Sequence, residues 1–529
     1  MADVADGLKP ANENPWYVLM TLYGEEGPDL GPVNREKNRE VWNAWACQNI
    51  PPEQKVTLAE QTGLELVELE GWPRLASEIH RKFKERWLKE NPKSGISLTS
   101  EGLSSLLNPA DNIEMSGTRF IAPLEFRKYI FPADVKMGNS VFRSVADFHK
   151  SHFTCDLSLI GTEFKKVCIF SGVRIAGKTN FENTTFYERA LFHKANFEQE
   201  TYFNFCSFND DVNFSETVFL HSSFKNVNFA TRTNFQKIRC KNKANFRGAQ
   251  FRSETNFSAA TFEGETNFSS SNFEGITNFK DATFKQGVSL SRTVFREYSY
   301  FVKSKFGTIS KGISGYVDFS DSQFEKPTSF RNAFFLEYYP NFRGALLHES
   351  SVFTADKAHW PRETHQTAAQ AKDSCAIIRQ VLAKQGLPED EHFFFRREMK
   401  FLRQSQSISN RPLYTLYWLL SDYGHSLRRP TIALFLLCLL PAFFYAGGKL
   451  GVSSNSLDVL LPSINDYWNA TGFSFANIFK FFGFQRVYFE QHVATLTSQL
   501  KLLSAVQTVF GYALLFFLGL GLRQRFRLR

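Results

Sequence analysis

An apolar side chain recurs at alternating steps of five and six residues from Phe120 to Phe306. Of the 35 positions in this register, which we call centre positions, 30 are Phe. The five others are also apolar: Met137, Leu159, Ile175, Cys240 and Leu290. The most regular stretch contains Phe246, Phe251, Phe257, Phe262, Phe268, Phe273, Phe279 and Phe284. A fixed short period predicts a solenoid, and the tolerance of other apolar residues predicts that the centre positions are buried.

The residues around each centre position predict an extended chain rather than a helix. A small side chain lies two residues earlier, as Thr255 does before Phe257 and Ala260 does before Phe262. Positions two apart face the same side of an extended segment, so both are expected inside. The Asn between them, such as Asn256, is expected outside, stacked on its equivalent in the next coil. Steps of five and six drift around a 3.6-residue turn, which excludes an amphipathic helix.

This pattern resembles the pentapeptide-repeat family, whose motif is Ala-(Asp/Asn)-(Leu/Phe)-x-x. The resemblance implies a β-solenoid, a right-handed quadrilateral β-helix, over residues 118–354, with four steps to a coil. The chain departs from the motif by one extra residue in every second step, as between Phe262 and Phe268, and in this is similar to the Phe-rich variant of the family. We place the extra residue at a corner. The step from Phe219 to Phe224 has five residues where six are expected, so one corner lacks it.

The solenoid region is mildly basic. Residues 118–354 contain 30 Lys and Arg against 23 Asp and Glu, a net charge of +7. Some pentapeptide-repeat proteins are acidic mimics of DNA, and a basic solenoid lacks the charge that such mimicry needs. Rings that point inward cannot stack on bases, so no specific nucleic acid is expected as a partner.

Motifs for catalysis or for metal and cofactor binding are not found. The sequence contains no Walker loop, nucleophile elbow or HExxH motif. The seven Cys lack metal-ligand spacing, and Cys168, Cys206 and Cys240 fall where small buried side chains are expected. Three histidines beyond the solenoid lack Cys or carboxylate partners and are interpreted as solvated: His359, His365 and His392. The sequence therefore predicts no cofactor and no enzymatic activity.

Residues 1–115 predict a separate helical module. Met1 to Asn14 is interpreted as a polar tail without the apolar core of a signal peptide. Trp42 and Trp45 lie at helical spacing, and residues 75–88 predict an amphipathic helix with a basic face. A solenoid needs its end covered, so we expect this module to cap the first coil. A dedicated partner-binding domain is the alternative.

Residues 360–410 predict a helical hairpin. Thr367 to Lys384 and Glu389 to Arg403 have helical patterns, separated by Gly386-Leu387-Pro388. The segment resembles the helical hairpin that follows the repeats in membrane-associated pentapeptide-repeat proteins. The residues that carry this resemblance are Arg379, Phe394, Arg397 and Glu398.

Residues 411–529 predict a membrane domain with two spans, at about 431–448 and 502–522. Basic residues flank both runs: Arg428, Arg429, Arg523, Arg525, Arg527 and Arg529. The loop between the runs is poor in basic residues, so the positive-inside rule puts both flanks in the cytoplasm. These flanks also argue against the buried hairpin of a soluble protein. We expect a multi-pass protein of the bacterial inner membrane, with the N-terminal and repeat domains in the cytoplasm.

Two aromatic segments accompany the spans. Pro412 to Leu420 suits an aromatic belt, and Phe473 to Phe489 is interpreted as an interfacial or re-entrant helix on the far side. Two spans joined by a re-entrant segment is the plan of a simple pore-loop channel, but the Thr-Val-Gly-Tyr-Gly filter is absent. Gly511, Gly519 and Gly521 suit close helix packing instead.

The function favoured by these patterns is that of a non-enzymatic, membrane-anchored scaffold. Its rigid solenoid would present a surface to a protein partner of unknown identity or to membrane lipid, and a homo-oligomer is left open. The alternative is a channel-like or membrane-perturbing effector with the solenoid as its sensor.

Overall fold

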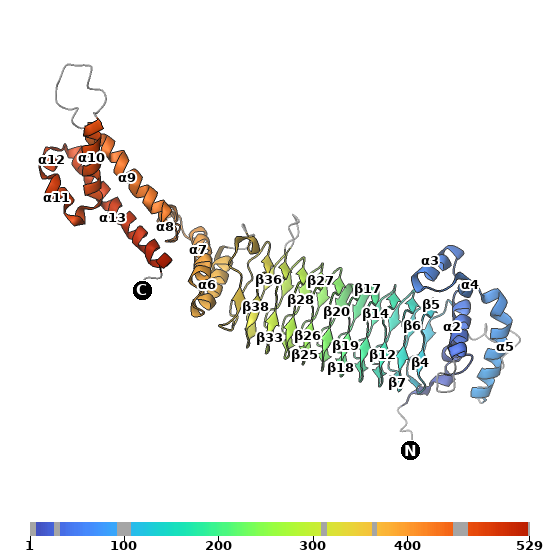
Figure 1. Ribbon diagram of the computed structural model, residues 1–529. Helices are drawn as coiled ribbons and strands as arrows, with labels where there is room; N and C mark the ends of the chain where they lie inside the picture. The colour runs from blue at the N-terminus through green and yellow to red at the C-terminus, as the bar shows by residue number, and fades with distance from the viewer. Residues whose placement is uncertain are drawn as a thin grey trace. The chain divides into compact units, whose positions relative to one another are not determined.

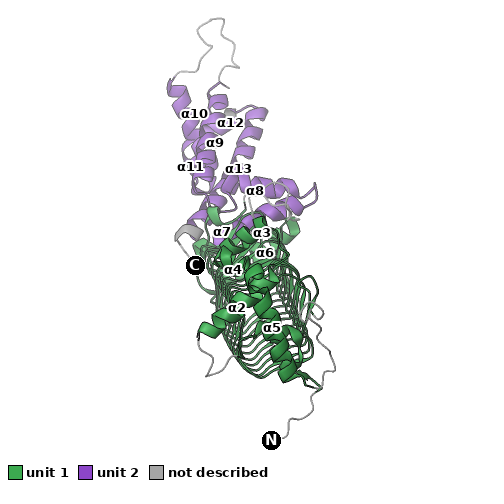
Figure 2. Cartoon of the chain, turned by 90° about the vertical axis from the view of Figure 1, so that its right-hand side faces the viewer, with its two compact units in different colours: residues 1–391 green, residues 392–529 purple. Residues whose placement is uncertain are grey.

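The computed structural model describes residues 7–25, 32–92, 107–307, 315–361, 368–447 and 464–526. It contains two compact units, residues 1–391 and 392–529, and each is described by itself (Figure 2). The first unit holds the N-terminal helices, a long β-solenoid and the helix that follows it (Figure 1). The second unit is helical.

The solenoid is four-sided and is built from short parallel strands, from β2 (Ile113–Glu114) to β40 (Val352–Phe353). One coil shows the plan, with one short strand on each face: β25 (Gln250–Phe251), β26 (Thr255–Asn256), β27 (Thr261–Phe262) and β28 (Thr266–Asn267). We call the faces that contain these strands the first, second, third and fourth faces. Each strand pairs in register with the equivalent strand of the next coil, as Phe251 does with Phe273. The predicted β-solenoid is confirmed.

The core consists of stacked rings. All 35 centre positions between Phe120 and Phe306 are at most 1% exposed. Rings one coil apart lie parallel, as in Phe246 and Phe268, whose centroids are 4.7 Å apart and whose planes differ by 7°. Rings across the coil meet edge to face, as in Phe257 and Phe268, at 5.3 Å and 82°. The small residues two positions earlier, such as Thr255, are also buried. The interior is therefore a continuous aromatic stack.

The corners are of two kinds. Five-residue steps turn through a left-handed residue two positions after the centre, such as Ala259, Ser270 and Asp281, with φ of 56°, 59° and 57°. An N–H to C=O bond closes this turn, as from Ala260 to Phe257 at 3.1 Å. The six-residue steps use the other two corners, where the chain is longer; between Phe120 and Phe306, which the structure describes throughout, none of these steps contains a residue with positive φ. The extra residue of the repeat does lie at a corner, as the sequence predicts.

The pairing of successive coils is irregular at two places, where the number of residues in a coil changes. Strand β17 (Asn196–Tyr202) and β20 (Val218–Ser223) run around the corner between the third and fourth faces, and their register shifts there. Val218 pairs with Arg239, so the short step from Phe219 to Phe224 makes this coil shorter than its neighbours. Further along, Val288 pairs with Val317, and the coil between them is longer than the regular one because extra residues are inserted. This insertion follows Phe306, the last residue of the regular register, and residues 308–314 of it lie outside the described residues.

The N-terminal helices cover the first coil. They are α1 (Pro15–Met20), α2 (Pro32–Ala46), α3 (Pro52–Thr62), α4 (Leu66–Leu69) and α5 (Trp72–Glu90). The indole N–H of Trp42 donates to Ile130 O at 2.8 Å, and the hydroxyl of Tyr129 donates to Met20 O at 3.0 Å. The predicted polar tail is wrong from Lys9 onward, because β1 (Lys9–Pro10) pairs with Thr118 and Arg119 and so joins the first face. Backbone groups at the open edge of the sheet gain partners in this way.

The other end of the solenoid is also covered. The Trp360 ring stacks on Phe335 with centroids 4.7 Å apart. Helix α6 (Ala368–Lys384) then follows, and the hydroxyl of its Ser374 donates to Pro340 O at 2.5 Å. Gln385, just beyond α6, donates to Ser351 O at 2.7 Å. Helix α7 (Pro388–Ser405) comes next, so the two helices lie where the sequence predicts them.

The second unit contains α8 (Arg411–Ser421), α9 (Arg428–Gly447), α10 (Ile464–Ile478), α11 (Phe484–Tyr488), α12 (Glu490–Thr495) and α13 (Ser498–Phe526). By length and composition, α9 and α13 could each cross a membrane. The prediction of one helix over Phe473–Phe489 is wrong. The chain leaves α10 at Ile478, makes a 3₁₀ turn at Lys480–Phe482, and reverses through Gly483, whose φ is 78°. That left-handed conformation interrupts a helix and favours Gly.

Candidate interaction surface and polar cluster

The second face of the solenoid carries a ladder of asparagines. Asn213, Asn234, Asn256 and Asn278 lie on successive strands in register. Each Oδ1 accepts the backbone N–H two residues further along its own chain, at 2.9 to 3.0 Å. The asparagines are therefore aligned from coil to coil, as the sequence predicts. Their observed hydrogen bonds, however, join each Asn to its own coil and not to the next one. Within the described chain the four Nδ2 groups donate no hydrogen bond, so the ladder presents amide donors about 4.8 Å apart.

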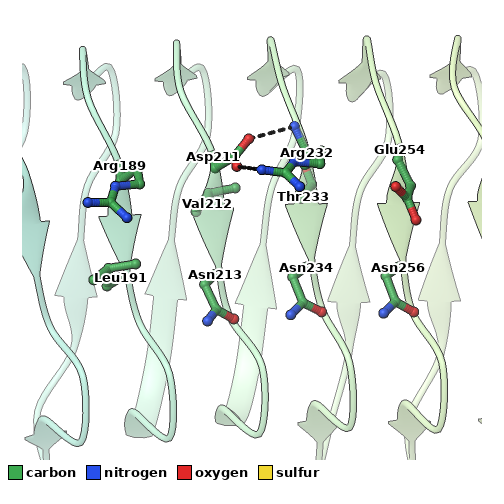
Figure 3. A pocket seen from close by; sticks show the side chains of 10 residues that line it. All are labelled: Arg189, Leu191, Asp211, Val212, Asn213, Arg232, Thr233, Asn234, Glu254 and Asn256. Atoms are coloured by element: carbon green, nitrogen blue, oxygen red, sulfur yellow. Dashed lines mark hydrogen bonds and ion pairs between the residues drawn. The ribbon is translucent and has the colours of Figure 1, made fainter.

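A shallow hollow of about 400 Å³ lies over this ladder (Figure 3). One side is the row of asparagines, and the other is a row of charged side chains at the corner between the first and second faces. The lining residues are Arg189, Leu191, Asp211, Val212, Asn213, Arg232, Thr233, Asn234, Glu254 and Asn256. The hollow is a groove along the solenoid, because each row takes one residue from each successive coil.

The charged row alternates in sign. Arg232 Nη2 lies 2.6 Å from Asp211 Oδ2, and both side chains are partly exposed, so this pair contributes little to stability. Partial burial raises the pKa of Asp211, but the hydrogen bonds and the charge of Arg232 outweigh burial and leave that pKa below its ordinary value. Arg189 and Glu254 are exposed, and neither forms an ion pair with any described residue. The row thus offers one cation and one anion to an external group.

The sequence-predicted centre residues lie inside and cannot bind a partner. Phe246 through Phe284 are all fully buried, as are Cys168, Cys206 and Cys240. Burial raises the pKa of the Cys240 thiol to about 12, so this thiol is inert at neutral pH. Sequence reasoning assigned no residue of the solenoid surface to binding. The surface rows could be found in the sequence by comparing the residues that occupy the same position in successive coils. This comparison requires the register of the coils to be known.

Helices α9, α10 and α13 of the second unit pack against one another (Figure 1). A cluster of polar side chains joins them. Pro441 lies inside α9 and has no N–H, so the C=O of Leu437 loses its helical donor. Gln507 Nε2 of α13 donates to that oxygen at 2.9 Å. The next two carbonyls of α9 are also satisfied from α10. Ser474 Oγ donates to Cys438 O at 2.7 Å, and Tyr467 OH donates to Leu439 O at 3.2 Å.

Further amide and hydroxyl groups close this cluster. Tyr445 OH donates to Gln507 Oε1 at 3.0 Å, and Asn477 Nδ2 donates to the same oxygen at 3.2 Å. Gln485 Nε2 donates to Asn477 Oδ1 at 2.9 Å. Ser474, Asn477 and Gln507 are at most 1% exposed. Because buried polar groups are costly unless paired, the cluster fixes α10 against both α9 and α13.

The comparison with known families bears on the solenoid. The family described as Pentapeptide repeats (9 copies) matches residues 159–207 and 235–282. The solenoid carries pentapeptide repeats. The unmatched residues between these two segments include the coil that lacks one corner residue. No curated protein and no solved structure matches the chain.

Beyond the pentapeptide repeats, the basic flanks are found at the ends of the two apolar helices. Arg428 and Arg429 open α9, and Arg523 lies near the end of α13. Arg429 donates to Trp418 O at 2.6 Å and lies 3.9 Å from Asp422. Arg525 belongs to α13, while Arg527 and Arg529 lie outside the described residues.

The glycines of α13 differ in their surroundings. A Cβ on Gly511 would lie 3.2 Å from Ile478 Cα, and one on Gly521 would lie 2.7 Å from a Leu427 methyl. Gly519 has open space around it. Close packing therefore explains Gly511 and Gly521 but not Gly519.

The histidines after the pentapeptide repeats are not simply solvated. His359 packs against Phe334 with ring centroids 4.3 Å apart, and His392 packs against His425 with ring centroids 4.9 Å apart. The interpretation as solvated residues holds only in part: both rings are half-buried, and each has an aromatic neighbour that the linear spacing does not reveal. His365 lies outside the described residues. In the described parts of the chain, no group of three His, Cys, Asp or Glu side chains is placed to hold a metal ion.

Proposed function

We propose that the protein is a non-enzymatic scaffold, anchored in a membrane, whose rigid solenoid presents its second face to a protein partner. The observation that carries this proposal is the combination of a long, ring-filled pentapeptide-repeat solenoid with two apolar helices of spanning length. A stack of buried rings resists bending, so surface residues of the solenoid hold fixed spacings. Such a body suits recognition rather than catalysis.

The anchor consists of α9 and α13. Arg428 and Arg429 at one end and Arg523 at the other support an arrangement with both flanks in the cytoplasm of a bacterial inner membrane. The solenoid and the N-terminal helices are then cytoplasmic. Arg403 and Arg429 lie 5.0 and 5.3 Å from the Trp418 ring, which suits α8 to the headgroup region. Membrane lipid is thus a second partner.

The hollow over the asparagine ladder is the proposed contact for a protein. Its free amide donors complement backbone carbonyls and carboxylates, and Arg189 and Glu254 add one charge of each sign. A polar, extended segment of a partner that lies along the solenoid would meet these groups in turn. The solenoid has too small a positive charge, spread over too many faces, for nucleic acid to be favoured.

A site-specific photo-crosslinker tests this proposal. It is introduced at Asn234, on the second face, and at Asn245, on the fourth face, in the full-length protein in native membranes. The two positions are matched, since each Asn is half-buried and each accepts an N–H two residues on. We expect a discrete protein adduct from position 234 only. Adducts of equal yield at both positions, or adducts from position 245 alone, would refute the second face as the contact.

One observation favours the channel-like alternative. The chain enters along α10, turns at Lys480–Phe482 and returns through α11 and α12, as a re-entrant segment would. We nevertheless expect purified protein in planar bilayers to leave conductance at baseline, because the polar cluster around Gln507 is internally paired and Gly511 is closed by Ile478. Reproducible single-channel steps that are lost on substitution of Phe481 or Phe482 would replace the scaffold by the channel.

A further inference from the structure

The turn between α10 and α11, residues 479–484, lies level with the middle of α13. Ile478 packs on Gly511, the hydroxyl of Thr508 donates to Asn477 O at 3.2 Å, and the rings of Phe481 and Tyr512 are 6.1 Å apart. Gly511 is about 19 Å from Ser498 and about 18 Å from Arg523 along the helix. If α13 spans the membrane as proposed above, on which this inference rests, the turn is near the centre of the bilayer.

The turn is poorly suited to contact with acyl chains. Its backbone is irregular, with a 3₁₀ turn followed by Gly483 in the left-handed region. Lys480 in the turn and Arg486 just after it are exposed within the described chain. Irregular backbone and ionised side chains at this depth occur where protein or water covers them, not where lipid does.

We propose that this turn is covered by a second copy of the chain, in an isologous, two-fold contact between membrane domains. The charges on the surface are self-complementary, because Lys480 and Arg486 lie close in sequence to Glu490 at the start of α12. None of the three forms an ion pair with a described residue. In a contact that relates two copies by rotation, the cations of one copy meet Glu490 of the other.

Exposed aromatic and aliphatic side chains supply the apolar part of the same surface. Phe481 and Phe482 are 58% and 62% exposed, and Val487 and Tyr488 are 71% and 72% exposed. Together with the charged residues they form one continuous segment of chain. The contact therefore combines an apolar centre with paired charges, which is the usual anatomy of an interface between subunits.

Photo-crosslinking in membranes tests the contact. A crosslinker at Phe482 in the full-length protein is compared with one at Phe435, which is 64% exposed and belongs to α9 rather than to the turn. We expect an adduct of twice the chain's mass from position 482 only. Glu490→Lys should lower its yield about tenfold, or roughly 1.4 kcal/mol of contact free energy. Lys480→Glu combined with Glu490→Lys should restore it.

The outcomes separate this inference from the proposed anchor. Alkaline carbonate extraction of the same membranes reports whether the protein is integral, and light scattering in detergent reports the number of copies. Release by carbonate would overturn both the anchor and the contact. If the protein stays in the membrane after carbonate extraction, any of three results would overturn the contact alone. These are a lipid adduct at position 482, a monomer by light scattering, and equal dimer yields at positions 482 and 435.

Discussion

Phe268→Asp tests the inward facing of the centre positions. Phe268 is fully buried, stacks on Phe246 at 4.7 Å and meets the edges of Phe257 and Phe279 at 5.3 and 5.6 Å. Removing a buried Phe side chain costs about 3 to 5 kcal/mol, and a carboxylate left without donors among rings adds several more. We expect the free energy of unfolding to fall by about 5 kcal/mol or more.

Asn267→Asp is the matched control, one residue away on the outer side of the same strand. Asn267 is half-buried, and its Oδ1 accepts the N–H of Ser269 at 2.8 Å. A carboxylate accepts the same hydrogen bond and stays in contact with water. This substitution should change the free energy of unfolding by about 0.5 kcal/mol or less.

The assay is thermal unfolding of the detergent-solubilised protein, followed by the β-sheet signal in circular dichroism. The two variants should separate clearly, with the Asn267→Asp curve close to that of the wild type. Acid should partly rescue Phe268→Asp, because burial raises the pKa of the introduced carboxyl and its neutral form is less costly to bury. Equal loss of thermal stability in both variants would show that the assigned facing is wrong.

Three further outcomes are expected. A reporter that is active only outside the cytoplasm should work when inserted near Asn455, which lies outside the described residues, and fail when fused after Arg529; the reverse result would place the solenoid outside the cell. Burial, aided by nearby Arg174, lowers the pKa of His152 to about 4. The unfolded chain takes up a proton at His152 below a pH of about 6.5, so stability should fall by up to about 3 kcal/mol as pH drops to the folded-state pKa. That loss should be smaller in His152→Gln when urea midpoints at neutral and acidic pH are compared, and equal acid sensitivity of both proteins would contradict it. Gln507→Leu leaves Leu437 O without its donor and should cost about 1 to 2 kcal/mol in detergent unfolding, whereas Val506→Leu on the exposed side of α13 should be nearly silent.

Much of the solenoid could be predicted from the sequence because its information is local. The inward facing of Phe257 and Thr255 follows from the two-residue alternation of an extended chain. The lost corner residue between Phe219 and Phe224 is visible as a change of one in spacing, and the structure shows the corresponding register shift. The two apolar helices are equally local, since length and composition identify them.

The candidate interaction surface and the polar cluster depend on residues that are distant in the chain. Arg189, Asp211 and Arg232 form a row because successive coils bring them to the same corner, although one of those coils is shorter than the other. Their alignment therefore requires the register of the whole solenoid. Lys9 joins the first face by pairing with Thr118, which lies far along the chain. No local sequence pattern signals this pairing.

The sequence by itself determined what each short segment buries: a ring in every step of the solenoid and an apolar surface in α9 and α13. Those properties depend on side-chain size and polarity at a fixed period. Only the tertiary structure decided which polar groups meet. Pro441 leaves the Leu437 carbonyl without its helical donor, and that carbonyl finds its donor in Gln507, 70 residues away. Packing of α9 against α13 creates that hydrogen bond, because a hydrogen bond depends on distance in space and not on separation along the chain.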